Sequence, residues 1–352
     1  MTLNRPVKET LRSLLKHLPC HRRRLTCAFL VLLSVGLLLT SACRSLFVRS
    51  DTSIPRLATP LAQADFNSLI ARLTQFTDMS ALRTQRVLLQ FFDTQSAKRL
   101  PAADAILVFQ RPDKIRLRLQ YLSAKVADMV SENNHFKVAI YRPEEYRRFL
   151  IGMNDADYSR MRAKLDKKEQ QSALLNARPF HFTDALLMRP LHSGDARFIY
   201  SLEESLVEEP DPRKGAPKGA RLWHSFYVIT ELEAATQPGA PARARRRFWF
   251  DRLNQAQFAR QQLFDEQGQV ATEIEYSNYG KLSPDSNQLW PGVILVSRPR
   301  DNYAALLTFT MDAESYVINP DLREARPFIL ENEEGLPETN LDKQPKPESD
   351  NP

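Results

Sequence analysis

The most reactive side chains in this 352-residue chain are its three cysteines, Cys20, Cys27 and Cys43. A thiolate can attack an electrophile, bind a metal or take up an acyl group. All three lie within the first 43 residues, so the rest of the chain offers no thiol for a disulfide, a metal or a nucleophile. His17 and His21 flank Cys20, but they lie in a basic segment before an apolar run, and we attribute the spacing to chance.

The remaining candidates for catalysis are isolated in the sequence. There is no HxH or HExxH spacing, and no GxSxG, phosphate-binding or dinucleotide-binding motif. Glu273 and Glu275 share one face of a predicted strand, but Ile274 and Tyr276 make the other face apolar, so the acids are expected to face outward. We therefore predict no enzyme, no catalytic residue, no metal site and no cofactor. The isolated groups are His135, His181, His192, His224, Glu203, Glu204, Glu208 and Glu209.

Residues 25–42 form an uncharged, apolar run directly after three arginines. A basic segment, an apolar segment and then small residues are typical of a secretory signal, predicted here at residues 1–42. The string Leu39-Thr40-Ser41-Ala42-Cys43 resembles the lipobox of bacterial lipoproteins, which implies cleavage before Cys43 and a diacylglycerol on its thiol. Thr40 departs from that pattern, in which leucine is commoner. The alternative is an uncleaved membrane anchor, because the apolar run is borderline in length for a span. Both place the body outside the inner membrane.

The positive charge is concentrated in the leader. The whole chain has a formal net charge of +7, but residues 1–42 hold seven basic side chains and one acid, which leaves +1 for the remainder. Nucleic-acid binding requires concentrated positive charge on the folded part, so it is not expected. One basic cluster remains, and it either meets anionic lipid headgroups or ends a solvated loop. It consists of Arg243, Arg245, Arg246 and Arg247.

Composition separates a folded part, residues 64–330, from two flanks. Residues 43–63 lack periodicity, which predicts a tether, and the acidic, proline-rich residues 331–352 predict a disordered tail. The folded part opens with apolar residues at helical spacing and Asp65 as the expected N-cap. The predicted helices are 64–76, 155–175 and 178–188, and the predicted strands are 84–92, 105–110, 114–121, 125–130, 135–141, 146–151, 197–207, 221–232, 246–251, 257–265, 269–279, 292–297 and 304–317.

Successive antiparallel strands with one apolar face must close up or be covered. The order of the elements therefore predicts an α+β, mainly β domain, in which an unclosed antiparallel β-barrel has helices covering its mouth.

Several short strings resemble one protein family. Residues 109–117, with Arg111-Pro112 near the start, are similar to an element of the LolA/LolB-like superfamily of periplasmic lipoprotein carriers and receptors. Residues 126–130, 135–138, 141–143 and 149–152 resemble the following elements, and residues 250–252, 265–268, 274–276, 290–291 and 298–299 resemble the closing strands. Asn133-Asn134 stands where relatives often have Asp-Gly. The resemblance covers about residues 64–330 and implies an unclosed barrel of about eleven strands with a helical lid, whose apolar interior receives acyl chains.

The alternating strands also indicate which side chains face the interior. Larger barrels leave a lumen, and ligand pockets are mostly apolar, so these residues are the candidate lipid-binding set. The alternative is that they fill an ordinary core, and that the helices at 155–175 and 178–188 are a fixed cover rather than a gate. The set is Phe109, Ile115, Leu117, Leu119, Phe136, Val138, Ile140, Phe248, Phe250, Ile274, Tyr276, Leu295 and Phe309.

These observations favour an envelope lipoprotein, anchored through Cys43 and facing the periplasm from the outer membrane. Arg44, with no acid beside Cys43, permits such sorting by analogy with other bacteria. The expected activity is binding of lipid or lipoprotein acyl chains, for lipoprotein sorting or outer-membrane insertion, with a periplasmic carrier protein as partner. The alternative is a regulatory or scaffolding lipoprotein that senses lipids through the same fold and relays this to a protein partner. Transfer of acylated cargo between membranes would distinguish the two.

Overall fold

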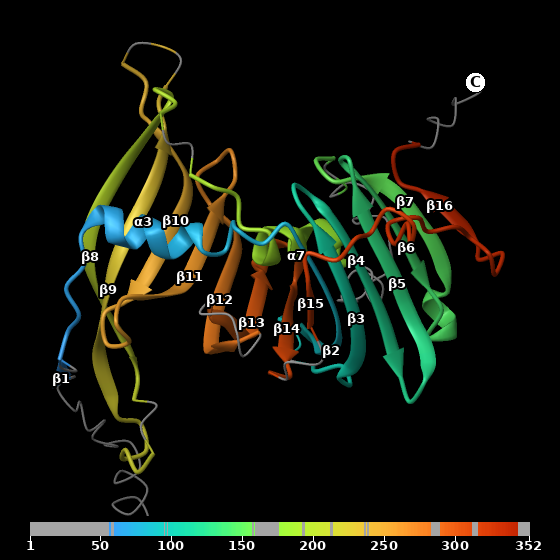
Figure 1. The fold of residues 1–352 in the computed structure, drawn as a ribbon, viewed down its shortest axis with the longest axis horizontal. Helices are drawn as coiled ribbons and strands as arrows, with labels where there is room; N and C mark the ends of the chain where they lie inside the picture. Colours follow the sequence, from blue (N-terminus) through green and yellow to red (C-terminus); the bar gives the residue numbers. More distant parts are fainter. Residues whose placement is uncertain are drawn as a thin grey trace, which may run out of the picture. The chain divides into compact units, whose positions relative to one another are not determined.

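The computed structural model describes residues 56–57, 60–94, 96, 98–156, 158, 176–191, 194–211, 214–235, 237, 239–282, 289–311 and 316–343 (Figure 1). Residues 56–216 and 222–352 form one compact unit, which is the unit considered below. The predicted signal peptide, Cys43, most of the tether, most of the predicted helix 155–175 and residues 344–352 lie outside the described residues. Within the described ranges, no helix combines the length and the apolar character needed to cross a bilayer.

Two helices and two short 3-10 turns accompany the strands in the described part of the chain. The N-terminal half of the chain contains β1 (Arg56–Leu57), α3 (Phe66–Thr74), β2 (Ala81–Asp93), β3 (Ala103–Gln110), β4 (Lys114–Tyr121), β5 (Ala124–Glu132), β6 (His135–Ile140), η2 (Glu144–Tyr146) and β7 (Arg148–Met153). The C-terminal half contains α7 (Pro179–Leu186), β8 (Phe198–Pro210), β9 (Arg221–Glu233), β10 (Arg243–Asp251), β11 (Gln257–Phe264), β12 (Val270–Lys281), β13 (Leu289–Arg298), η3 (Pro299–Asp301), β14 (Tyr303–Phe309), β15 (Tyr316–Ile318) and β16 (Glu338–Asn340).

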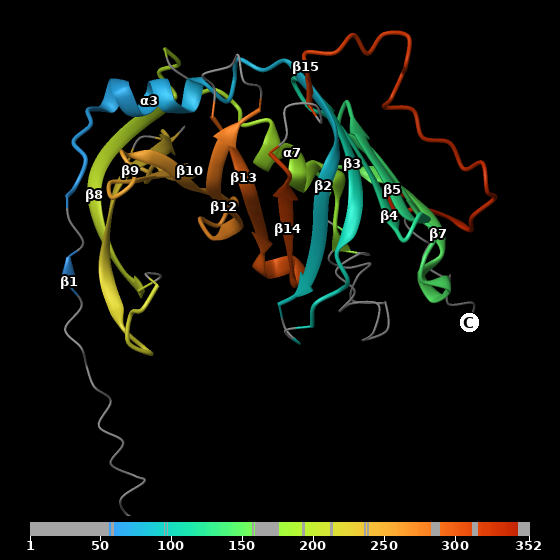
Figure 2. The same cartoon turned by 60° about the horizontal axis from the view of Figure 1, so that its bottom comes forward.

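All the described strands belong to one sheet, whose order is β1-β9-β10-β11-β12-β13-β14-β2-β3-β4-β5-β6-β7-β16, with β8 on β9 and β15 on β2 (Figures 1 and 2). Along this order, neighbouring strands are antiparallel except at the two ends, where β1 joins β9 and β16 joins β7 in parallel. The pairing of β14 with β2 joins the two halves of the chain. Because the end strands are not paired with each other in the described residues, the sheet is open, and the predicted mainly β, unclosed architecture is confirmed.

The strand count exceeds the eleven that the family resemblance implied. Among the described residues, thirteen strands have six residues or more, the number that the alternating pattern itself predicted. The predicted strand 304–317 is wrong in one respect, since it is two strands, β14 and β15, that both pair with β2. Phe309 of β14 pairs with Val87 and Tyr316 of β15 pairs with Thr84, so the two strands lie on either side of the irregularity that β2 carries between Thr84 and Val87.

The strand alternation of the sequence produces one buried face. On β4, Ile115, Leu117 and Leu119 are buried, while Arg116 and Arg118 point to the opposite side. We call the face that carries these apolar residues the inner face. The turn between β5 and β6 is made by Asn133 and Asn134 at φ 49° and 64°, a left-handed conformation that asparagine tolerates better than most residues.

Both described helices pack against the inner face. Helix α3 begins as predicted, because the Asp65 carboxylate accepts a hydrogen bond from the Ser68 backbone N–H at 2.7 Å. Its Leu69 and Leu73 are buried in the main core, and α3 contacts β11. Helix α7 contacts β4, β5 and β13, and most of its side chains are buried. The predicted helix at 178–188 is therefore confirmed by α7.

The predicted boundary at residue 330 is wrong, because residues 319–343, here called the C-terminal strap, fold onto the outer face. Phe328, Leu330 and Leu336 are buried in a second apolar cluster with side chains of β2, β3, β5, β6 and β7. β16 then adds to the sheet beside β7. Polar contacts fasten the strap, including a 2.8 Å hydrogen bond from the Arg116 guanidinium to the Pro327 carbonyl. Composition missed the strap because its few apolar residues are separated by acids and prolines.

Candidate functional site

The structure brings together nearly all the predicted interior residues. Twelve of the thirteen lie in the main apolar cluster on the inner face. The exception is Leu295, which is half-buried on the outer face beside Glu275, whereas its neighbours Ile294 and Val296 are buried. The prediction for Leu295 was wrong because Val293–Val296 is a continuous apolar run, which does not reveal which residues point inward.

Aromatic rings fill a large part of this interior. The Trp290 ring stacks on Phe109 with centroids 6.0 Å apart and also contacts Phe76. The Phe258 and Tyr276 rings lie 4.8 Å apart. The predicted interior residues Phe109 and Tyr276 therefore contact other side chains and form part of an ordinary packed core at these positions. The part of the sheet from β10 to β13 therefore has a solid interior where these rings meet.

A cavity of about 570 Å³ opens at the other part of the sheet. Strands β2 to β5 supply Leu89, Phe91, Ala103, Leu119 and Val126 to its wall. The wall is mostly apolar because these positions all lie on the inner face. Of the thirteen predicted residues, Leu119 lines this cavity.

The rim of the cavity is partly charged. The segment after β6, Arg142-Pro143-Glu144-Glu145, closes one side, and its side chains are exposed. The last residue of β4, Tyr121, and the first residue of β5, Ala124, also line the cavity. Between them, Leu122 stands 84% exposed at φ 47°, so the tip of this hairpin presents a leucine to solvent beside the cavity. Sequence reasoning missed the rim, because it depends on where strands end rather than on their alternation.

Arg111, from the motif that carried the family resemblance, ties the helices to the sheet. Its guanidinium donates to the carbonyls of Phe76 and Met79, which follow α3, and to those of Leu187 and Met188, which follow α7. The Nε–Met79 and Nη1–Met188 distances are 2.9 and 3.0 Å. One side chain from the β3–β4 turn thus fixes the C-terminal ends of both helices. Helix α7 has a further tie, since the ring of buried His181 contacts the Tyr303 hydroxyl of β14.

Replacing Arg111 with leucine is expected to loosen both helix ends. The carbonyls lose their shared donor, and each lost hydrogen bond to a charged group is worth about 1.5–3 kcal/mol. Hydrogen exchange should accelerate at residues 183–188, and chemical denaturation should report a lower free energy of unfolding. Arg118→Leu is the control, because its partner Asp128 keeps a second arginine and the Arg118 side chain is 42% exposed. Equal exchange protection of α7 in both variants would contradict the role given to Arg111.

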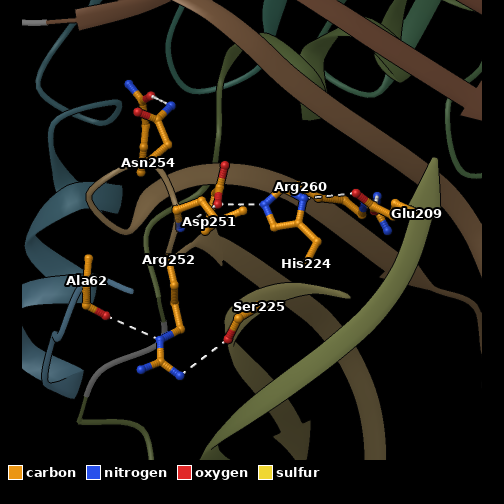
Figure 3. A network of polar contacts seen from close by, with 10 residues as sticks. Ala62, Glu209, His224, Ser225, Asp251, Arg252, Asn254 and Arg260 are labelled. Atoms are coloured by element: carbon orange, nitrogen blue, oxygen red, sulfur yellow. Dashed lines mark hydrogen bonds and ion pairs between the residues drawn. The ribbon is translucent and has the colours of Figure 1, made fainter. Parts of the chain in front are cut away.

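A second polar network joins β8, β9 and β10 (Figure 3). The two ring nitrogens of His224 lie 3.0 Å from a Glu209 oxygen and 2.7 Å from an Asp251 oxygen. Carboxylates only accept hydrogen bonds, so the ring donates from both nitrogens and is an imidazolium. Burial alone would lower the pKa of His224, but its hydrogen bonds to Asp251 and Glu209 and their charges outweigh burial and raise that pKa to about 9.

The stability of the fold should therefore fall in alkaline solution. The His224 pKa is raised from 6.5 to about 9 on folding, so its contribution is complete below pH 6.5 and is lost as the pH rises through 9. The contribution is on the order of 2–3 kcal/mol. His224→Gln should remove this pH dependence, measured as the free energy of unfolding by denaturant. His135→Gln, at an exposed position, is the control. A His224→Gln variant that keeps the wild-type pH profile would contradict the assignment.

The arginine cluster at 243–247 is part of β10 rather than a loop end. Arg246 is buried and paired with Glu231 at 2.7 Å, while Arg243 and Arg245 pair with Glu233. The outward placement of Glu273 and Glu275 is confirmed, since Ile274 and Tyr276 between them are in the main core. In the part of the chain that the structure describes, no group of three or more His, Cys, Asp or Glu side chains is arranged to hold a metal ion.

No protein-family model matches this chain, and no curated protein matches it. Solved structures do. A DUF1329 family protein from Desulfovibrio piger is 11% identical with a TM-score of 0.40, over 74% of this chain and 94% of its own. A protein described as an outer membrane lipoprotein-sorting protein domain, from Vibrio parahaemolyticus, is 9% identical with a TM-score of 0.37, over 73% and 94%. A LolA superfamily protein from Nitrosomonas europaea is 9% identical with a TM-score of 0.37, over 75% and 97%. These names include the superfamily that the sequence motifs resemble.

Proposed function

We propose that this chain is a lipid-anchored envelope protein that binds acyl chains of lipids or lipoproteins non-covalently, for lipoprotein sorting or insertion at the outer membrane. The observation that carries the proposal is the cavity of about 570 Å³ walled by Leu89, Phe91, Leu119 and Val126. Its volume is typical of ligand sites, which span about 300–1,000 Å³. Transfer of a methylene from water to an apolar site is worth about 0.8 kcal/mol, so even a short chain would be held.

The charged rim supports an amphipathic ligand. Arg142 lines the cavity and is exposed, so it can meet a carboxylate or phosphate while the acyl chain lies inside. Leu122, at the tip of the neighbouring hairpin, gives the mouth an apolar contact for a membrane surface. A chain could then pass from bilayer to cavity with little exposure to water.

Release of the ligand requires a movable element, and we assign this role to α7. It contacts β4 and β5, which also wall the cavity. Its C-terminal end is held by the Arg111 guanidinium and by the Tyr276 hydroxyl, which donates to the Ala185 carbonyl at 3.0 Å, so loss of both ties would let that end lift from the sheet. In this proposal α3 and α7 are the cover of the interior.

Anchoring through Cys43 has its own test. Cys43→Ser should abolish incorporation of radiolabelled palmitate into the protein and release it from the membrane fraction. Two or three acyl chains give stable anchoring where one gives only marginal binding. Cys27→Ser, which changes a thiol within the predicted signal peptide, is the matched control and should label as the wild type does. Persistent labelling of Cys43→Ser would contradict the lipoprotein assignment.

The binding activity is tested by the lipids that accompany the protein. The chain from residue 44 onward is purified, and mass spectrometry should find co-extracted lipids that compete with a fluorescent fatty acid. Absence of both lipid and uptake would overturn the proposal. Movement of acylated cargo between two vesicle populations would support a carrier or receptor. Retention of lipid without transfer, together with capture of a signalling protein, would instead favour the regulatory role.

A further inference from the structure

A second cavity, of about 430 Å³, lies at the C-terminal end of α3 and is walled largely by carboxamide side chains. Gln75 directly follows α3, Asn254 and Gln255 come from the β10–β11 turn, Gln257 begins β11, and Asn278 comes from β12. A carboxamide both donates and accepts hydrogen bonds. Hydroxyl groups do the same, so this wall complements a ligand rich in hydroxyls rather than an acyl chain.

One guanidinium in this wall is incompletely satisfied. Arg72 lines the cavity, and its Nε atom is buried without a hydrogen-bond partner among the residues that the structure describes. Buried donors are nearly always paired in native proteins, so an orphaned one indicates a missing acceptor. The Nε atom has no exposed surface, so an acidic oxygen of a ligand in the cavity would meet the other part of the Arg72 guanidinium, whose positive charge it matches.

Hydrogen bonds hold the β10–β11 turn, which carries two of the carboxamides; Figure 3 shows Asn254 and the neighbouring Asp251. The Asn254 N–H donates to the Asp251 carbonyl at 3.1 Å, and the Asn254 side chain donates to the Gln257 side chain at 2.7 Å. Asp251 is itself fixed by His224 and by the Leu253 N–H. A site whose groups are already positioned loses less entropy on binding.

Strained backbone also gathers around this cavity. Gln255, Ala256 and Asn278 have φ values of 53°, 54° and 55°, in the left-handed region. The conformation of Asn278 requires glycine opposite it, since a Cβ on Gly292 would lie 2.5 Å from the Asn278 carbonyl oxygen. Such conformations persist where the surroundings enforce them, and they cluster at ligand sites.

We propose that this cavity binds a saccharide that carries one acidic group, with its hydroxyls on the carboxamides and its acid on Arg72. Tyr279 and Leu289 supply apolar surface for the carbon face of the sugar. An extended peptide fits less well, because β11, β12 and β13 are each paired on both sides and offer no free strand edge. This activity is separate from acyl binding, whose cavity shares no lining residue with this one.

The test is saturation-transfer NMR on the full-length protein in detergent, with galacturonic acid and galactose as probes. Both should receive saturation, and the acid should bind about tenfold more tightly, as expected for one charge-assisted hydrogen bond. Arg72→Gln should remove this preference, and Gln255→Asn, which suits the left-handed backbone, should weaken both sugars by about fivefold. Gln267→Ala, in the β11–β12 turn, is the matched control and should leave both affinities unchanged.

The outcomes also separate two sources of the sugar. A free saccharide and the headgroup of an acidic glycolipid present the same chemistry, so phosphatidylcholine vesicles with and without acidic glycolipid form a second arm. Binding of either source that is lost in Arg72→Gln supports the proposal. The proposal would be overturned if neither sugar received saturation and no glycolipid bound, or if the wild type and Arg72→Gln bound the acidic sugar equally well. It would also be overturned if an alanine tetrapeptide, used as a third probe, bound better than the sugars. Fatty-acid uptake by the same variants shows whether acyl binding survives independently.

Discussion

Replacing Ala103 with phenylalanine is expected to weaken acyl-chain binding by at least about tenfold, or about 1.4 kcal/mol. Ala103 lies on the inner face of β3 opposite Leu89, and both line the 570 Å³ cavity. The added ring would occupy space that the ligand needs. Excluding two methylenes already removes about 1.6 kcal/mol of transfer free energy, which is enough for the predicted effect. Displacement of a fluorescent fatty acid measures the change.

The fold should tolerate this substitution, because the ring enters an existing cavity rather than a filled core. Ala102→Phe is the matched control, since Ala102 is the adjacent, exposed residue and is not among the residues that line the cavity. The control should bind the fatty acid as the wild type does. Wild-type affinity in a folded Ala103→Phe protein would show that acyl chains bind elsewhere.

Replacing Glu231 with alanine is expected to lower the free energy of unfolding by about 3–5 kcal/mol. The Glu231 carboxylate accepts two hydrogen bonds from the Arg246 guanidinium, both at 2.7 Å, and a third from the Tyr200 hydroxyl at 2.9 Å. The Arg246 and Glu231 side chains are only 9% and 1% exposed. Without the carboxylate, the Arg246 guanidinium remains buried beside the Arg189 and Pro190 carbonyls without its counter-charge, which is the costly part of breaking such a pair.

The same strand supplies the control for this prediction. Glu233→Ala breaks ion pairs with Arg243 and Arg245, whose side chains are more than one-third exposed, so the loss should be about 0–1 kcal/mol. Replacing Glu231 and Arg246 together with leucine should recover much of the loss, because no unpaired charge is then buried. Denaturant titrations measure all three variants. If Glu231→Ala and Glu233→Ala lowered the free energy of unfolding by similar amounts, burial would not strengthen the Glu231–Arg246 pair.

The face on which a strand residue lies can be predicted from the sequence where apolar and polar residues alternate strictly. Ile115, Leu117 and Leu119 alternate with charged residues, and their inner face was predicted correctly. The Val293–Val296 run has no alternation, and Leu295 was placed on the wrong face. The apolar cavity could not be predicted, because it arises where β2–β3 and β4–β5 end in space, which depends on register rather than on local pattern.

Polar contacts between residues far apart in the chain could not be predicted from the sequence either. The Arg246–Glu231 pair looks like part of a basic cluster until the pairing of β9 with β10 brings the two side chains together. The His224 network similarly needs β8, β9 and β10 at once, and none of its acids lies near His224 in the chain. The carboxamide cavity draws on α3, the β10–β11 turn and β12, and its scattered Asn and Gln residues give no motif.

The junction between β14 and β2 has a consequence for biogenesis. β2 begins at Ala81 and pairs with β3 on one edge, yet β14 and β15, which pair with its other edge, do not begin until Tyr303, so that edge stays open until most of the polypeptide has been made. Contacts of such long sequence separation are slow to form, and an unpaired strand edge invites aggregation or proteolysis in the meantime. We therefore expect the nascent chain to expose this strand edge until β14 emerges, and a deletion that removes β14 should yield no stable fragment.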